Sequence, residues 1–62
     1  MKLKDLEKII AADSDVGLID KTESGIPIVD TWGHWINGGL KTLDVPVLKI
    51  VSYGYILLVL DV

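Results

Sequence analysis

The last third of the chain, from Val45 to Val62, constrains the fold most, because 13 of its 18 residues are apolar. A membrane-spanning helix needs roughly 20 consecutive apolar residues, whereas Lys49 and Asp61 bracket only 11 positions here. The segment is also rich in Val, Ile and Tyr, whose side chains pack well on a pleated sheet. We therefore expect two strands in this segment and no membrane span.

The two expected strands form a terminal hairpin. One runs over about 47–52, a tight turn falls at Tyr53-Gly54, and the other carries the chain to its end. Because side chains alternate across a strand, Leu57 and Val59 lie on one face, and the opposite face carries Ile56, Leu58 and Leu60. Both faces are apolar, and small domains bury only about 60% of their unfolded surface. We therefore expect a helix to cover one face and a second copy of the chain to cover the other.

The first twelve residues predict an amphipathic helix. Leu3, Leu6 and Ile10 follow the three-and-four spacing that lines one helical face, while charged residues fall largely elsewhere. The polar run over 13–15 stops the pattern, because short polar side chains compete for local backbone hydrogen bonds. This helix should lie on the sheet.

Two more strands are expected near 16–20 and 26–30, joined by a polar turn over 21–25. Pro27 cannot donate a ladder hydrogen bond, which favours an edge position for the second of them. The segment 32–43 has no clear period and could be a loop or one helical turn capped by Gly38. The predicted fold is one small α+β domain over 1–62, with an N-terminal helix packed on a mainly antiparallel four-stranded sheet in the order α-β-β-loop-β-β.

The charge and cysteine content argue against several kinds of partner. Without cysteine the chain can form neither disulfides nor thiolate metal sites. Six lysines, no arginine and nine acidic residues give a net charge of −3, which disfavours nucleic-acid binding. The opening Met1–Asp5 does not have the pattern of a signal peptide, so we expect a cytoplasmic location.

The opening Met-Lys-Leu-Lys-Asp-Leu is followed by Ile9-Ile10, an apolar strand closing on Asp20, a Gly turn and a terminal apolar hairpin. This pattern resembles short uncharacterised proteins encoded by phages and prophages of Gram-positive bacteria. The chain departs from them in its Trp-rich middle segment and in the near absence of charge in the last strand. The resemblance implies a phage or mobile-element origin and a bacterial host, and it implies no activity.

Residues for catalysis are sparse. The chain has one histidine and three serines, and no base is recognisably placed beside a nucleophile. Asp30 and His34, four residues apart, would share a helical face as metal ligands, but a closed metal site takes about four ligands. We therefore expect no enzyme, no cofactor and no metal.

The cluster Trp32, His34 and Trp35 is unusual, because Trp contributes strongly to interfaces. The same rings could instead plug one end of a small core, and both alternatives stay open. Tyr53 and Tyr55 flank the last turn. The candidate interface residues are Trp32, His34, Trp35, Tyr53, Tyr55, Leu57, Leu58 and Val59.

Half of the residues are hydrophobic and the mean hydropathy is +0.47, which is more apolar surface than a chain of this length buries alone. This predicts a non-enzymatic protein–protein interaction module that self-associates as a homodimer or larger oligomer. The alternative is a phage-encoded inhibitor that binds a host defence or regulatory protein. A membrane-associated peptide is a third hypothesis.

Overall fold

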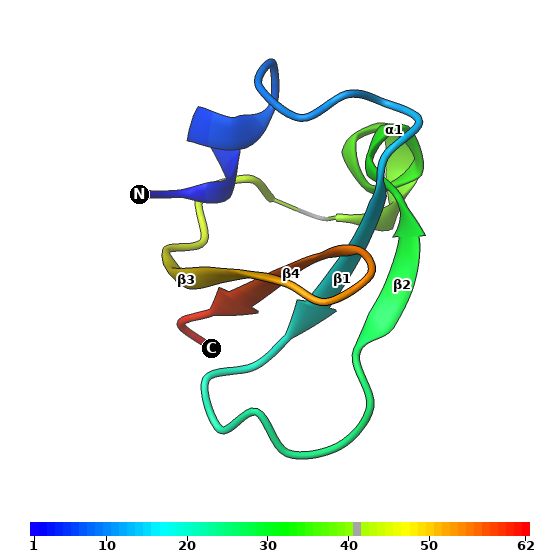
Figure 1. Cartoon of the computed structure of the whole chain (residues 1–62). Coiled ribbons are helices and arrows are strands. Elements are labelled where there is room, and N and C mark those ends of the chain that lie inside the picture. The colour runs from blue at the N-terminus through cyan, green and yellow to red at the C-terminus, as the bar shows by residue number, and fades with distance from the viewer. Residues whose placement is uncertain (41) are drawn as a thin grey trace.

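The computed structural model describes residues 1–40 and 42–62 and contains a four-stranded mixed sheet (Figure 1). Its strands are β1 (Asp15–Ile19), β2 (Ile28–Thr31), β3 (Val47–Ser52) and β4 (Ile56–Leu60), in the spatial order β2-β1-β4-β3. The two central strands, β1 and β4, are parallel, and each pairs with its outer neighbour in antiparallel fashion. The prediction of an α+β fold with four strands is confirmed, whereas the predicted N-terminal helix and its packing on the sheet are not.

The sheet has two apolar faces, as the alternation in β4 predicts. One face, called here the core face, packs with the buried side chains of Val16, Leu58 and Leu60. The other, called here the second face, carries Leu57 and Val59, which are also buried. Because Gly17 lies opposite Leu57 and Leu18 opposite Leu58, the same alternation runs through both central strands.

The predicted helix over the first twelve residues is wrong, because the structure has only a short 3₁₀ turn, η1 (Leu3–Leu6). The backbone N–H groups of Leu3 and Lys4 donate to the carbonyls of Val45 and Leu43 at 3.0 and 2.9 Å. From its first residues onward, the N-terminal segment therefore pairs with a segment that is distant in the sequence. Side chains three apart eclipse in a 3₁₀ turn, so Leu3 and Leu6 still share one direction and both enter the core.

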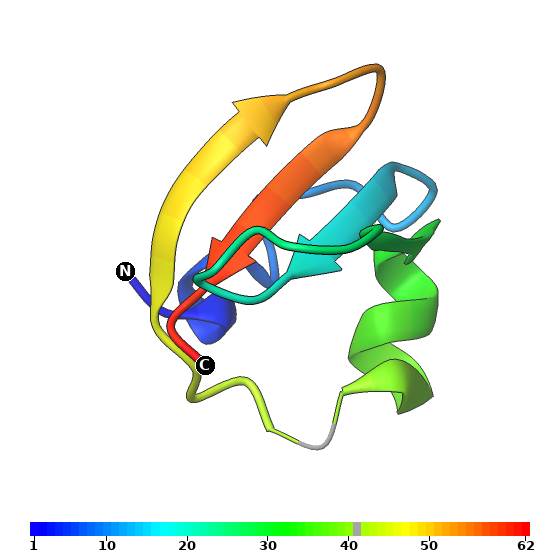
Figure 2. The same cartoon turned by 90° about the horizontal axis from the view of Figure 1, so that it is seen from below.

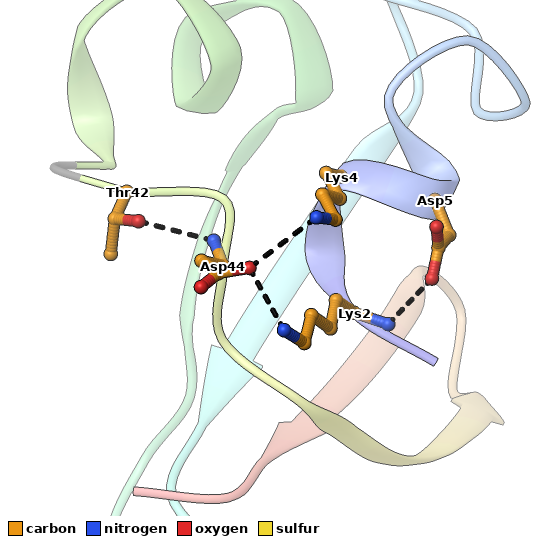
Figure 3. A network of polar contacts seen from close by, with 5 residues as sticks. All are labelled: Lys2, Lys4, Asp5, Thr42 and Asp44. Carbon is orange, nitrogen blue, oxygen red and sulfur yellow. Dashed lines mark hydrogen bonds and ion pairs between the residues drawn. The ribbon is translucent and has the colours of Figure 1, made fainter.

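Ion pairs fix the N-terminal segment beside the start of β3 (Figure 3). Lys2 Nζ and Lys4 Nζ lie 3.0 and 3.5 Å from Asp44 Oδ1, and the backbone N–H of Lys2 donates to Asp5 Oδ2. The hydrogen bond from the Lys2 ammonium is the main reason that the pKa of Asp44 is below its ordinary value. We call this contact of Lys2 and Lys4 with Asp44 the N-terminal clamp.

The middle segment is helical, which decides between the two alternatives that the sequence left open. It forms α1 (Trp32–His34) and a π-helical turn, η2 (Trp35–Gly39), and position 41 of the segment lies outside the described residues. The Nε1 groups of Trp32 and Trp35 donate to the carbonyls of Glu7 and Val16 at 3.3 and 2.9 Å. These bonds join the helical stretch over 32–39 to the N-terminal segment and to β1.

The second face is covered in part by the chain itself, through the long connection between β1 and β2 (Figure 2). Glu23 in this connection meets Lys49 of β3, with Oε2 and Nζ 3.0 Å apart. The backbone N–H of Lys21 also donates to the carbonyl of Val62 at 3.4 Å. The layer that we expected from a second copy is therefore supplied at least in part by residues 20–27. Among the described residues, no helix is long and apolar enough to cross a membrane.

Candidate interaction surface

The two tryptophans of the predicted cluster are packing residues of the fold. Trp32 is 1% exposed and is the largest of the fully buried side chains. Trp35 is half-buried and packs against the same core. Both rings also use their N–H groups in bonds to backbone carbonyls within the subunit. Of the two alternatives, burial at the end of the core therefore describes Trp32, and Trp35 is partly buried against the same core.

Three further candidates from the sequence, Leu57, Leu58 and Val59, lie in the centre of the sheet. All three are buried within a single subunit. Leu58 belongs to the core cluster on the core face, Leu57 and Val59 lie on the second face, and β4 is flanked by β1 and β3. In this structure they form no exposed surface, and we place them in the core.

His34 is exposed and is held by its neighbours at the start of α1. Its Nδ1 lies 2.7 Å from Asp30 Oδ2, while the Thr31 hydroxyl accepts the His34 backbone N–H at 3.4 Å. Asp30 Oδ1 also accepts the Thr31 N–H at 2.7 Å. The arrangement caps the first turn of α1. In the part of the chain that the structure describes, no group of three His, Cys, Asp or Glu side chains could hold a metal ion.

Tyr53 and Tyr55 are brought together beside the connection that covers the second face. Their ring centroids are 6.0 Å apart in an edge-to-face arrangement. The Tyr55 ring lies over Gly17, where an added Cβ would come within 2.7 Å of the ring, so only glycine leaves room for it. Tyr53 and Tyr55 help to form a hollow of about 200 Å³, called here the tyrosine hollow. It is lined by Ile19, Glu23, Gly25, Pro27, Tyr53, Tyr55 and Leu57.

The wall of the tyrosine hollow is organised by short-range polar contacts. The Asp20 carboxylate accepts hydrogen bonds from the backbone N–H and the hydroxyl of Thr22, and the hydroxyl bond is the main reason that its pKa is below the ordinary value. Glu23 has a positive φ of 55°, which is uncommon for a residue other than glycine. Beside the hollow, the side chain of Ile26 is 92% exposed and that of Tyr53 is 70% exposed. The hollow is open to solvent, and its lining is more apolar than polar.

The outer side of β3 is a second candidate surface. Within residues 1–40 and 42–62, its only pairing beyond β4 is an isolated bridge between Lys2 and Pro46, at the start of the strand (Figure 2). The side chains of Leu48 and Ile50 are 55% and 49% exposed. A strand edge of this kind offers unpaired backbone groups together with apolar side chains.

The direction of the backbone groups in β3 follows from its hairpin. The Tyr53 N–H donates to the Tyr55 carbonyl at 2.9 Å. Hydrogen-bonded and non-hydrogen-bonded pairs alternate in an antiparallel ladder. Tyr53 and Tyr55 form a hydrogen-bonded pair. Two pairs in β3 are therefore non-hydrogen-bonded, namely Ser52 with Ile56 and Ile50 with Leu58. The N–H and C=O groups of Ile50 and Ser52 consequently point away from β4, toward the open side of the strand.

No protein-family model, no curated protein and no solved structure matches this chain. The candidate surfaces therefore rest on its own geometry. The sequence identified Tyr53 and Tyr55, but it missed Ile26, Leu48 and Ile50. Part of the sequence pattern could have indicated that these residues are exposed. Ile26 precedes a proline in a polar connection, and Leu48 and Ile50 flank the single lysine of a strand.

Proposed function

We propose that this chain is a non-enzymatic protein–protein interaction module of phage type that self-associates in the cytoplasm of a bacterial host. One observation carries the proposal: among the described residues, as many large hydrophobic side chains are exposed as form the buried core, nine of each. Single exposed apolar residues are ordinary, whereas residues gathered on one structural feature are typical of contact sites. Here four of the exposed ones form two pairs at opposite edges of the sheet, Ile28 and Val29 on β2 and Leu48 and Ile50 on β3.

The proposed origin rests on the resemblance of the first ten residues to short phage proteins. The proposed non-enzymatic role is supported by the local use of the only histidine, whose Nδ1 is engaged by Asp30 at 2.7 Å in a helix cap. Expression in a bacterial cell followed by fractionation tests the location. Recovery with the cytoplasmic fraction supports it, and recovery with the membranes contradicts it.

Sedimentation velocity over a range of micromolar concentrations tests self-association. We expect the average mass to rise above that of the 6.8 kDa chain as the concentration increases. The exposed Lys8→Ala variant serves as a control that leaves both edge strands unchanged and should behave like the wild type. A single 6.8 kDa species at every concentration would contradict the proposal.

A second candidate function, inhibition of a host protein, is favoured by the tyrosine hollow. The hollow is apolar enough and large enough to take a side chain from another protein, and the exposed Ile26 stands in the sequence between two of its lining residues, Gly25 and Pro27. The test is capture of one protein at a 1:1 ratio from a bacterial lysate. The capture should be lost in Tyr53→Ser and kept in Ile9→Ser, which removes an exposed side chain of the N-terminal segment. Equal capture by both variants would exclude the hollow as the contact.

A further inference from the structure

We propose that two copies of the chain pair through β3, antiparallel to one another, with the two-fold axis at Val51. The pairing would join the two four-stranded sheets into one continuous sheet of eight strands. This inference rests on the proposed self-association and names the surface that performs it. Three features of β3 support a second copy as the occupant: the direction of its backbone groups, its side-chain pattern, and the length of its open edge.

The backbone groups determine the register of the pair. The outward-pointing N–H and C=O groups belong to Ile50 and Ser52, two residues apart. With the axis at Val51, Ile50 of one copy lies opposite Ser52 of the other, and the reverse holds by symmetry. Each of these two pairs exchanges both backbone hydrogen bonds, which makes four in total. A strand with two such residues can therefore pair with a second copy of itself. In this pairing the outward N–H and C=O groups of both residues are all hydrogen-bonded.

The side chains agree with this register. On the second-face side, Val51 meets Val51 of the second copy, and Lys49 lies opposite Tyr53 of the second copy. No like charges are directly opposite one another, which would be destabilising. The charge of Lys49 is already balanced by Glu23 at 3.0 Å within its own subunit. The Tyr53 ring is mostly exposed and can pack on the apolar stem of the lysine or face its ammonium group.

The length of the open edge also fits. The N-terminal segment occupies the start of β3, where the Val47 N–H donates to the Met1 carbonyl at 2.7 Å. The paired stretch runs over 49–53 in each copy, so it begins just after the occupied part and ends at the hairpin turn. A longer extended peptide would collide with the N-terminal segment at the start of β3. A second β3 does not extend that far, because its chain turns back at Gly54, which has a positive φ of 77°. The open edge thus has the length that self-pairing requires.

The experiment is sedimentation equilibrium on the wild type, Ser52→Pro and Ser52→Ala. Proline at position 52 removes an outward-pointing donor that β4 does not use, and edge strands tolerate proline at such positions. The symmetric pair loses two hydrogen bonds, so we expect self-association to weaken by at least about tenfold. Ser52→Ala keeps the backbone donor and should self-associate like the wild type. Circular dichroism checks that each variant is folded.

If Ser52→Pro is folded and associates as tightly as the wild type, pairing through β3 is wrong while self-association stands. If the wild type is monomeric at all concentrations, the proposed function fails and this inference fails with it. If Ser52→Pro does not fold, two substitutions at the exposed position 53 test the register instead. Tyr53→Lys places a cation opposite Lys49 of the second copy, whereas Tyr53→Glu places an anion there. Weaker association of Y53K than of Y53E supports the register, and equal association overturns it.

Discussion

β2 and β3 form the two edges of the sheet, and they differ in length, in their neighbours and in their charges. β2 has four residues, follows Pro27 and leads directly into the capped start of α1. β3 has six residues and also follows a proline, Pro46, and its single lysine is turned to Glu23 of the same subunit. Natural sheets blunt their edges with short strands, proline and charged side chains. Its shorter length and its direct continuation into α1 close the β2 edge to further strands, whereas the β3 edge is open beyond the register irregularity between Val47 and Lys49 and the N-terminal segment.

The largest expected effect concerns β4, the interior strand that pairs with the β3 edge. Leu58 in β4 is fully buried and lies opposite Leu18 on one side and Ile50 on the other. Leu58→Ala should lower the free energy of unfolding by about 2–5 kcal/mol, because it leaves a cavity in the core. Urea denaturation of wild type and variant measures this loss.

The matched control for Leu58→Ala lies at the β2 edge of the same row of residues. Ile28 pairs with Leu18, as Leu58 does, but its side chain is exposed. Ile28→Ala should therefore remain within about 0.5 kcal/mol of the wild type. Equal losses in the two variants would contradict the distinction between an interior strand and a closed edge.

The next effect concerns the N-terminal segment, which covers both the core face and the start of β3. Leu6 is buried, whereas Ile9, three residues later, is exposed. Leu6→Ala should cost about 2–3 kcal/mol in unfolding free energy, the lower end for such a substitution, because a peripheral segment can partly relax. Urea denaturation measures this loss, and Ile9→Ala should stay near the wild type in the same assay. Near-wild-type stability of Leu6→Ala would show that η1 does not close the core.

The smallest expected effect concerns the N-terminal clamp and its dependence on pH. The hydrogen bond from Lys2 and the charges of Lys2 and Lys4 lower the pKa of Asp44 in the folded state. A lowered folded-state pKa adds stability above the ordinary carboxyl pKa, and this stability is lost as the pH falls through the folded-state value. Asp44→Asn should thus be slightly less stable than the wild type at neutral pH and equal to it in strong acid.

Thermal unfolding of Asp44→Asn as a function of pH measures the clamp. Asp13→Asn, which neutralises an exposed acid in the turn before β1, is the control and should show no such difference. A constant difference between Asp44→Asn and the wild type at every pH would mean that the clamp does not act through the charge of Asp44.

Local patterns predicted the hairpin of β3 and β4 well. The expected strand over 47–52 matches β3, and the alternation of Leu57 and Leu58 between faces is observed. The spacing of Leu3 and Leu6 also predicted the correct buried face, although not the helix. That error arose because the backbone N–H groups of Leu3 and Lys4 donate to the carbonyls of Val45 and Leu43, a distant pairing that no local periodicity reports.

The covering of the second face was not predictable from composition. Residues 21–25 have the polar character of a tight hairpin turn, whereas their place over the sheet depends on contacts such as that of Glu23 with Lys49. The same limit applies to the tyrosine hollow. Tyr53 and Tyr55 stood out in the sequence, but Ile19 and Pro27 join them only through the fold.

Hydrogen exchange of the backbone amides of Ile50 and Ser52, followed by NMR over a range of concentrations, tests pairing through β3 most directly. These two amides point to the open side of the strand, while the Val51 amide points toward β4. We predict that Ile50 and Ser52 exchange rapidly in dilute solution and become protected as dimers form, while Val51 is protected throughout. Formation of dimers with no change in the exchange of Ile50 and Ser52 would contradict the pairing.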